Sequence, residues 1–406
     1  MKILVLNSGS SSQKASLYAL THALPQSAVA ALWDGRVEWQ GDRVVLEAHN
    51  STGAILKQAT NICTPPEATE RLLDTLTAGQ ARVIASLFEI DAVGHRIVNG
   101  GQEFTQPTAI TAGVKTAIAS MSSFAPLHNR AELDGIEIIE KRMRHALQVA
   151  VFDTGFHTGL PEAAAVYPGP YEWIGQGIRR YGFHGINHQY CAERAAQLLG
   201  KDLAALKLVT CHLGNGCSLA AIRGGRSIDT TMGFTPLEGL MMGTRSGSVD
   251  PGILTYLLRQ GHTGQDLDEM LNAKSGLLGI SGLSADMRMV VSAMKEGNAR
   301  AKLAFDVFIH RLRSGIAAMV ATLSGIDGLV FTAGIGENSP EVRSAACSNF
   351  AFLGLAIDPA KNVASLSDRD IAATHSAIRV LVVHAQEDWA IARECWKVSL
   401  AAKAAT

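Results

Sequence analysis

Three glycine-rich segments carry the residue types best suited to binding phosphate. They are Asn7 to Ser12 (NSGSSS), His212 to Gly216 (HLGNG) and Gly334 to Asn338 (GIGEN), and each follows an apolar segment. Glycine lets backbone N–H groups approach phosphate oxygens closely, and hydroxyl side chains add further donors. One such segment alone is more often an ordinary tight turn. We therefore interpret the three as candidate anion cradles whose meaning depends on their context.

The third segment has the most informative context. Ser339 followed by Pro340 is an N-cap with proline at the first helical position, so a helix is predicted to begin directly after the turn. A helix N-terminus favours negative charge. The two familiar nucleotide motifs, G-x-x-x-x-G-K-[ST] and a G-x-G-x-x-G between strand and helix, do not occur in the sequence. Any nucleotide site must therefore be of another type.

Composition narrows the function further. The chain has 406 residues, of which 47% are hydrophobic and 18% charged, which predicts a globular protein of two domains with a ligand cleft between them. The formal net charge is −1, and no block of Lys or Arg favours nucleic acid or anionic lipid as a partner. No segment approaches the ~18 apolar residues that a membrane span needs. The six cysteines form no C-x-x-C pair, so we expect reduced thiols and a cytoplasmic protein.

The elements that would position these residues follow a repeated pattern. The N-terminal residues 2–20 read as strand, Gly/Ser turn and strand. Residues 206–222 repeat this with a strand ending at Thr210 or Cys211, an Asn215-Gly216 turn and a second strand. Helices are predicted at 66–76, around 133–139, at 189–199 and at 301–323, and further strands at 148–152, 328–331 and 378–383.

Alternating strands and helices indicate an α/β fold, and the repeat indicates two similar halves. We expect an N-terminal α/β domain over 1–152, completed by a C-terminal helix at 387–406, and a nucleotide-binding domain over 153–386.

Ten short strings, in order along the chain, then show a resemblance. They are LVLNSGSSSQK, GHRIVNGG, FAPLHNR, VFDTGFH, RRYGFHG, TCHLGNG, DTTMGFTPLEGLMMGTRSG, KSGLLGISG, VFTAGIGENS and EDWAIAR, and they run from residue 4 to residue 393. The chain resembles the acetokinase family, the acetate, propionate and butyrate kinases of the sugar kinase, Hsp70 and actin superfamily. The resemblance implies two RNase H-like domains with the active site in the cleft between them, and a homodimer.

The resemblance also implies roles for particular residues. Arg96 would hold the substrate carboxylate, Asp153 would be the active-site aspartate, and His184 with Arg245 would stabilise the transition state. Val98 looks like the acetate-preferring form, since propionate-preferring relatives tend to carry alanine there.

The cofactor roles are implied in the same way. Asn7 and Glu387 would lie on the side of Mg²⁺, for which Mn²⁺ could substitute. The ATP or ADP contacts would come from four parts of the chain: Lys14; His212, Leu213, Gly214, Asn215 and Gly216; Asp286, Met287 and Arg288; and Gly334, Ile335, Gly336, Glu337 and Asn338.

These residue types suit phosphoryl transfer to a carboxylate. The transition state spreads charge over three oxygens, so catalysis is mostly positioning and cationic stabilisation. Acetate is already ionised at neutral pH, so no base is needed, and Asp153 is interpreted as orienting an arginine or the water shell of the metal. We interpret His95 and His188 as structural, and His128 either as structural or as supporting the residues that contact the substrate.

Other functions stay open at this point. A propionate or butyrate kinase would share every motif. A sugar-type kinase would give Asp153 the role of a base, and an ATPase resembling actin or Hsp70 would ignore acetate. The chain departs from the family pattern at Asn99, Ile186, Asn187, Ser248, Ala385 and Gln386, which lie beside the predicted functional residues rather than on them.

Overall fold

The computed structural model describes residues 1–8, 12–21, 23–40, 43–61, 64–121, 126–364 and 368–404, without the side chains of residues 8, 40 and 126–130. Gly9 to Ser11 of the first glycine-rich segment, Cys63 and the side chain of His128 therefore lie outside the described residues. The chain divides into two compact units. Unit 1 is Met1–Gly155 with Gln386–Thr406, and unit 2 is Phe156–Ala385.

The sheet of unit 1 has the strand order β5-β4-β3-β2-β1-β6-β8-β7. Its strands are β1 (Lys2–Ser8), β2 (Ser12–Ala19), β3 (Trp33–Gln40), β4 (Arg43–Asn50), β5 (Ile55–Asn61), β6 (Ala92–Ile97), β7 (Thr108–Ala109) and β8 (Leu147–Phe152). Strands β1 to β5 form an antiparallel meander, whereas β6 pairs in parallel with both β1 and β8. The carboxyl ends of β1, β6 and β8 therefore lie at one edge of the sheet.

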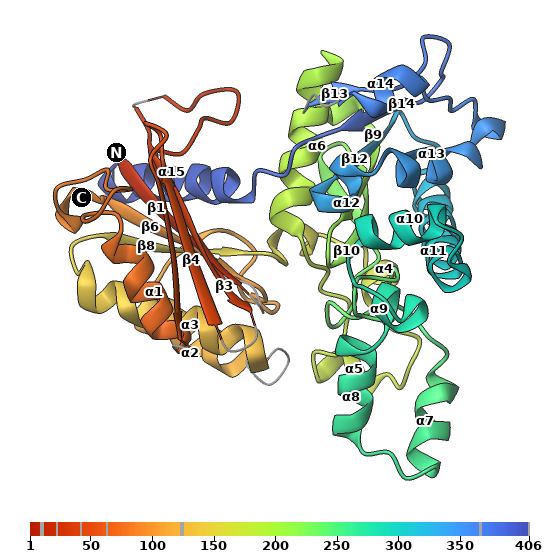
Figure 1. Ribbon diagram of the computed structural model, residues 1–406, viewed down its shortest axis with the longest axis horizontal. Coiled ribbons are helices and arrows are strands. Elements are labelled where there is room, and N and C mark those ends of the chain that lie inside the picture. The colour runs from red at the N-terminus through yellow and green to blue at the C-terminus, as the bar shows by residue number, and fades with distance from the viewer. Residues whose placement is uncertain are drawn as a thin grey trace. The chain divides into compact units, whose positions relative to one another are not determined.

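Helices cover both faces of this sheet (Figure 1). They are α1 (Pro65–Asp74), α2 (Ala112–Ser120), α3 (Pro126–Arg142) and α15 (Glu387–Ala404). Successive strand residues point to opposite faces. Val93 accordingly packs in the core with residues of α1 and α3, while at Gly94 a Cβ atom would meet Ile391 of α15. The C-terminal helix thus belongs to the first half of the chain.

The sheet of unit 2 has the order β11-β10-β9-β12-β14-β13. Its strands are β9 (Lys207–Leu213), β10 (Cys217–Arg223), β11 (Arg226–Thr230), β12 (Gly328–Thr332), β13 (Arg369–Asp370) and β14 (Arg379–Val382). β9, β10 and β11 are antiparallel, and β12 pairs in parallel with both β9 and β14. The central order β3-β2-β1-β6-β8 of unit 1 is therefore matched by β11-β10-β9-β12-β14 in unit 2.

Two long helices flank this second sheet, α6 (Gly185–Leu199) and α11 (Ala299–Leu323). The remaining helices are α4 (Glu162–Ala165), α5 (Glu172–Gly175), α7 (Pro251–Arg259), α8 (Gly264–Ala273), α9 (Gly276–Ser281), α10 (Met287–Lys295), α12 (Ala333–Asn338), α13 (Pro340–Ser348) and α14 (Pro359–Val363). Figure 1 shows α10, α12 and α13 near the ends of β9 and β12. Within the described ranges, no helix has both the length and the apolar character that crossing a membrane requires.

The repeated strand order confirms the predicted α/β fold with two similar RNase H-like halves. Two local predictions were wrong. β9 continues to Leu213, because His212 and Leu213 still pair with Ser218 and Cys217 of β10, so the turn shrinks to Gly214–Gly216. Gly334 to Asn338, expected as a glycine-rich turn, belong to the short helix α12, which begins at Ala333 with a positive φ of 64°.

Candidate active site

In unit 1, Arg96 and Asp153 form an ion pair at the carboxyl ends of β6 and β8. Nη2 of Arg96 lies 2.5 Å from Oδ2 of Asp153, and the two side chains are only 14% and 1% exposed. Burial opposes the charge on Arg96, but Asp153 and then Glu387 hold the pKa of the guanidinium above its ordinary value. Nε of Arg96 is buried and has no hydrogen-bond partner within the described residues. The guanidinium is therefore charged and retains a donor for a further anion.

A second carboxyl group, Glu132 on α3, lies in the same region. Its Oε1 atom accepts a hydrogen bond from the backbone N–H of Val98 at 2.9 Å, and the side chain is buried. Burial raises the pKa of Glu132 to about 7, against the lowering effects of the Val98 N–H and of Arg96. Glu132 was not predicted from the sequence, because a glutamate on an amphipathic helix is usually exposed.

The predicted metal-side residues also meet in unit 1. Nδ2 of Asn7, in β1, lies 3.5 Å from Oε2 of Glu387 and donates to Oδ1 of Asp388 at 2.8 Å. Asp388 in turn accepts from the hydroxyl of Ser16 at 2.7 Å. Asp388 was missed in the sequence analysis, although it directly follows Glu387 in the first turn of α15. Lys14 is exposed and lies opposite Asn7 in the β1–β2 ladder, so both side chains emerge on the same face of the sheet.

In unit 2, three segments far apart in sequence line one pocket of about 710 Å³. The predicted residues that line it are Gly214, Asn215, Asp286, Met287, Arg288, Gly334, Ile335 and Asn338. The lining is completed by six residues that were not predicted to bind the nucleotide: Ala285, Val291, Ser292, Lys295, Ser339 and Glu341. The pocket thus joins the β9–β10 turn with the N-terminal ends of α10, α12 and α13.

Local sequence explains these helix ends. Asp286 caps α10 by accepting the N–H of Arg288 at 2.9 Å, and Ser339 caps α13 by accepting the N–H of Val342 at 3.3 Å, with Pro340 at the first helical position. The prediction of a helix beginning after Ser339 is confirmed. Lys295 contributes a cation and is paired with Glu341 at 2.7 Å. Helix N-termini and a lysine make this end of the pocket suited to a polyanion.

Other predicted nucleotide residues do not line the pocket. Leu213 is buried in the core, and the carboxylate of Glu337 accepts from the backbone N–H of Ala385 at 2.9 Å and pairs with His384 at 2.5 Å. Arg343 is buried beneath α12 and donates to the carbonyl oxygens of Gly336 and Glu337, each at 2.8 Å. These contacts hold α12 in place, and neither Glu337 nor Arg343 lines the pocket.

His184, His212 and Arg245 converge on the Gly214–Gly216 turn. The rings of His184 and His212 stack with centroids 3.9 Å apart. A Cβ atom on Gly216 would lie 3.4 Å from both Nε2 of His184 and Nη2 of Arg245. His184 has a positive φ of 57°, an uncommon conformation outside glycine that often marks a functional position. Nδ1 of His184 forms a hydrogen bond with the hydroxyl of Ser218 at 2.8 Å. Nε2 of His188 forms a hydrogen bond with the same hydroxyl at 2.7 Å. Ser218 was not predicted.

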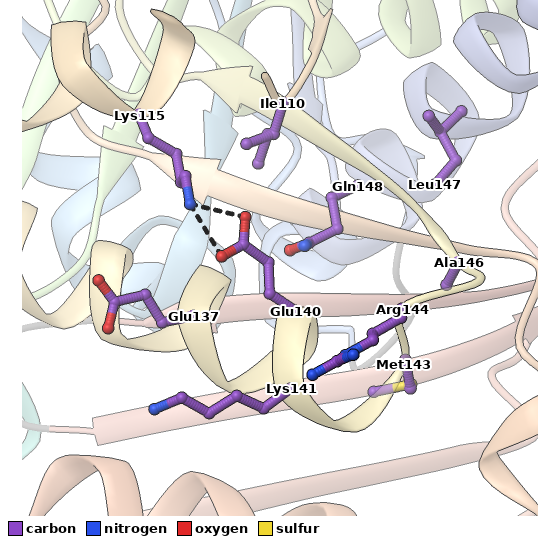
Figure 2. Close-up of a pocket in the computed structure, with 10 residues that line it drawn as sticks. All are labelled: Ile110, Lys115, Glu137, Glu140, Lys141, Met143, Arg144, Ala146, Leu147 and Gln148. Carbon is purple, nitrogen blue, oxygen red and sulfur yellow. Dashed lines mark hydrogen bonds and ion pairs between the residues drawn. The ribbon is translucent and has the colours of Figure 1, made fainter. Parts of the chain in front are cut away.

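A second pocket, of about 660 Å³, lies in unit 1 and contains none of the predicted residues (Figure 2). Figure 2 shows Lys115 paired with Glu140, at 2.8 Å, beside Lys141, Arg144 and Gln148. Residues 147 and 148 open β8, so this pocket is at the amino end of that strand, opposite the end that carries Asp153. Ligands of such sheets bind at the carboxyl ends of parallel strands, which favours Arg96 and Asp153 as the site.

Comparison with known proteins gives the family. The sequence profile of the Acetokinase family matches residues 2–393. The chain belongs to the acetokinase family. Among its curated relatives, the acetate kinase of Nostoc punctiforme is 59% identical over 402 residues, covering 98% of this chain and 99% of that one. The acetate kinase of Gloeobacter violaceus is 58% identical over 405 residues, with coverage of 98% and 99%. The resemblance drawn from the sequence is confirmed.

Solved structures of two kinases agree with this fold. The acetate kinase of Porphyromonas gingivalis has a TM-score of 0.89 at 38% identity, covering 98% of this chain and 99% of that one. A propionate kinase from Francisella tularensis has a TM-score of 0.88 at 37% identity, with the same coverage. Membership of the acetokinase family makes this protein an enzyme, a kinase that uses ATP or ADP.

Proposed function

We propose that the protein transfers the terminal phosphoryl group of ATP to acetate, reversibly, giving acetyl phosphate and ADP. The observation that carries the proposal is the buried Arg96–Asp153 pair at the carboxyl end of β6. A guanidinium fork fits a carboxylate through two parallel hydrogen bonds. Asp153 uses Nη2, and the remaining donors of Arg96 would hold the acetate carboxylate.

The nucleotide would occupy the 710 Å³ pocket of unit 2. Supporting this are the helix N-termini of α10 and α13, the Gly214–Asn215 backbone and the ammonium of Lys295, all of which line it. We expect the phosphates to approach the Gly214–Gly216 turn, since His184 and Arg245 lie against Gly216. These two side chains would stabilise the charge that develops on the transferred phosphoryl group.

The residues of unit 1 fit a magnesium ion. Asn7, Glu387 and Asp388 supply amide and carboxylate oxygens within one hydrogen-bonded group, and Mg²⁺ in kinases is usually held by one or two carboxylates together with substrate phosphates. Among the described residues, no cluster of three or more His, Cys, Asp or Glu is suited to a metal. When bound, the ion would neutralise phosphate charge; Mn²⁺ would be a substitute.

The reaction needs no general base. Acetate is ionised at neutral pH, so its oxygen can attack the terminal phosphorus directly once Arg96 has oriented it. Asp153 forms an ion pair with Arg96. We therefore assign it a positioning role without proton transfer. Exclusion of water from the bound substrates would limit hydrolysis of ATP.

The test is a direct assay. Purified protein is incubated with ATP, Mg²⁺ and acetate, and acyl phosphate is trapped with hydroxylamine; the proposal requires hydroxamate well above the control without acetate. A panel of sugars in place of acetate should give no phosphorylated product. If sugars react and acetate does not, the acceptor is a hydroxyl and Asp153 becomes a base.

Propionate is the second candidate acceptor, because a propionate kinase is among the similar structures. Val98 would leave less room beside the acyl group than the alanine of propionate-preferring relatives, which favours the smaller acid. One methylene changes specificity by only ~1–3 kcal/mol, so the values of kcat/KM for acetate, propionate and butyrate decide between them.

We also propose a homodimer in the cytoplasm, acting without nucleic acid or membrane. The near-neutral net charge of −1 agrees with the last two points. Light scattering during gel filtration would measure the oligomeric state, and a monomeric mass at micromolar concentration would contradict the dimer.

A further inference from the structure

Asn187 lies in the first turn of α6 and is fully buried, with 0% of its surface exposed. Its Nδ2 atom lies 2.8 Å from Nδ1 of His212, at the end of β9, and 3.4 Å from the hydroxyl of Thr332, at the end of β12. His212 and Thr332 are direct neighbours in the parallel β9–β12 ladder. One amide therefore bridges the carboxyl ends of the two central strands of unit 2.

The oxygen of this amide makes a third contact. The thiol of Cys191, one helical turn further along α6, donates to Oδ1 of Asn187 at 3.5 Å. In this structure Oδ1 of Asn187 faces Cys191, and Nδ2 faces His212. Because Nδ2 can only donate, Nδ1 of His212 must accept. The neutral ring of His212 therefore carries its proton on Nε2.

That proton faces the glycine-rich turn. Nε2 of His212 lies 3.8 Å from where a Cβ of Gly214 would be, and Gly214 lines the nucleotide pocket. Thr332, the other partner of Asn187, directly precedes α12, which supplies Gly334, Ile335 and Asn338 to the same pocket. Asn187 thus contacts the last residues before two walls of the pocket, the turn after β9 and the helix α12 after β12.

We propose that Asn187 is a positioning residue of the nucleotide pocket, which holds His212 in the tautomer that offers an Nε2–H to a phosphate oxygen and ties together the strands that carry two of the pocket walls. The inference rests on the proposed function in one respect, that the occupant of the pocket is a nucleotide with its phosphates near Gly214. The tautomer itself is independent of that function.

The first measurement is of the tautomer. The ¹⁵N chemical shifts of His212 in the full-length protein, assigned by comparison with His212→Gln, report which ring nitrogen is protonated. The expected result for the unliganded wild type is a proton on Nε2. A proton on Nδ1 overturns the proposal, whatever the activity.

The second measurement is ADP affinity against pH, by calorimetry on wild type and Asn187→Asp. A carboxylate at this position accepts from Nδ1–H, so the neutral ring of the variant has a bare Nε2 facing the phosphate. Between pH 7 and pH 9 we expect the variant to lose affinity by about tenfold, the worth of one charge-assisted hydrogen bond, while the wild type changes little. Equal pH profiles for the two proteins overturn the proposal.

Two further variants complete the design. Asn298→Asp adds the same charge in unit 2 at the N-cap of α11, where Asn and Asp are equivalent caps, and should behave as wild type. Should Asn187→Asp not fold, Asn187→Ser removes the bond to His212 without adding charge, and mixed tautomers are expected; a ring still protonated only on Nε2 contradicts the proposal. If the wild type binds no ADP, the proposed function fails, while the ring shifts still decide the role of Asn187.

Discussion

Nη2 of Arg96 lies 2.5 Å from Oδ2 of Asp153, at the ends of two adjacent parallel strands and almost out of contact with solvent. A buried ion pair of this kind is a poor source of stability, because desolvation offsets most of the attraction. It is well suited to holding a guanidinium in one orientation toward a ligand. The pair is thus more readily explained by substrate binding than by folding.

Arg96→Ala should remove the use of acetate while leaving the nucleotide pocket intact. We expect kcat/KM for acetate to fall by at least about 100-fold, from the loss of two charged hydrogen bonds. ADP affinity, measured by calorimetry, should stay within about twofold, because the 710 Å³ pocket belongs to unit 2. Comparable losses of both would contradict the assigned role of Arg96.

Glu132→Gln should change how stability depends on pH. Burial raises the pKa of Glu132 from 4.5 to about 7, despite Arg96 and the Val98 N–H, with Asp153 acting in the same direction as burial. Between these two pH values the folded state holds a proton that the unfolded state releases. The contribution of Glu132 to the free energy of unfolding is therefore fully present below about pH 4.5 and is lost as the pH rises through 7. A shift of this size corresponds to about 3 kcal/mol.

Gln keeps the acceptor for Val98 but does not titrate. We expect chemical denaturation from pH 5 to pH 8.5 to show that the free energy of unfolding of the variant rises relative to that of the wild type as the pH increases. Glu137→Gln, an exposed position on the same helix, is the control and should follow the wild type. An unchanged pH dependence in Glu132→Gln would show that Glu132 does not titrate in this range.

Gly243→Ala should weaken nucleotide binding through Asn215. The added Cβ would lie 2.1 Å from Oδ1 of Asn215 and 3.2 Å from the carbonyl oxygen of Ala285, and both of these residues line the pocket. We expect ADP affinity to fall by roughly tenfold, with kcat reduced less. Gly264→Ala, whose Cβ meets nothing within 4 Å, should bind ADP normally. If Gly243→Ala bound ADP with the affinity of the wild type, Asn215 would not contribute to nucleotide binding.

Arg343→Met should destabilise unit 2 and loosen α12. Arg343 is 1% exposed and donates to the carbonyls of Gly336 and Glu337 and to the side chain of Asn362. Burial lowers the pKa of its guanidinium to about 10. Removing these donors leaves buried carbonyl oxygens unpaired, at about 1–3 kcal/mol for each such group.

Thermal unfolding followed by calorimetry measures this loss. Arg311→Met, an exposed arginine on α11, is the matched control and should unfold at the wild-type temperature. If the stability of Arg343→Met were unchanged, water would have to donate to the carbonyl oxygens of Gly336 and Glu337 in place of the guanidinium. ADP affinity should fall together with stability, because α12 lines the pocket.

Much of the fold could be predicted because it depends on local patterns. The apolar runs before Asn7 and His212 form the antiparallel pairs β1–β2 and β9–β10, and the Ser339-Pro340 signal starts α13. The errors came where pairing with other strands competes with local preference. β9 extends through His212 because β10 supplies hydrogen bonds to it, and Gly334 to Asn338 become helical because Arg343 caps that turn from below.

The sequence by itself determined the α/β class, the repeat of two halves and the family, because these follow from hydrophobic period and from strings of adjacent residues. Only the tertiary structure revealed that Asn187 touches both His212 and Thr332, that Glu132 is buried against Val98, and that Asp388 binds Asn7. Each of these contacts joins residues that lie tens to hundreds of positions apart. Their chemistry depends on distances of about 3 Å and on exclusion of water, and neither is encoded in the local pattern of the chain.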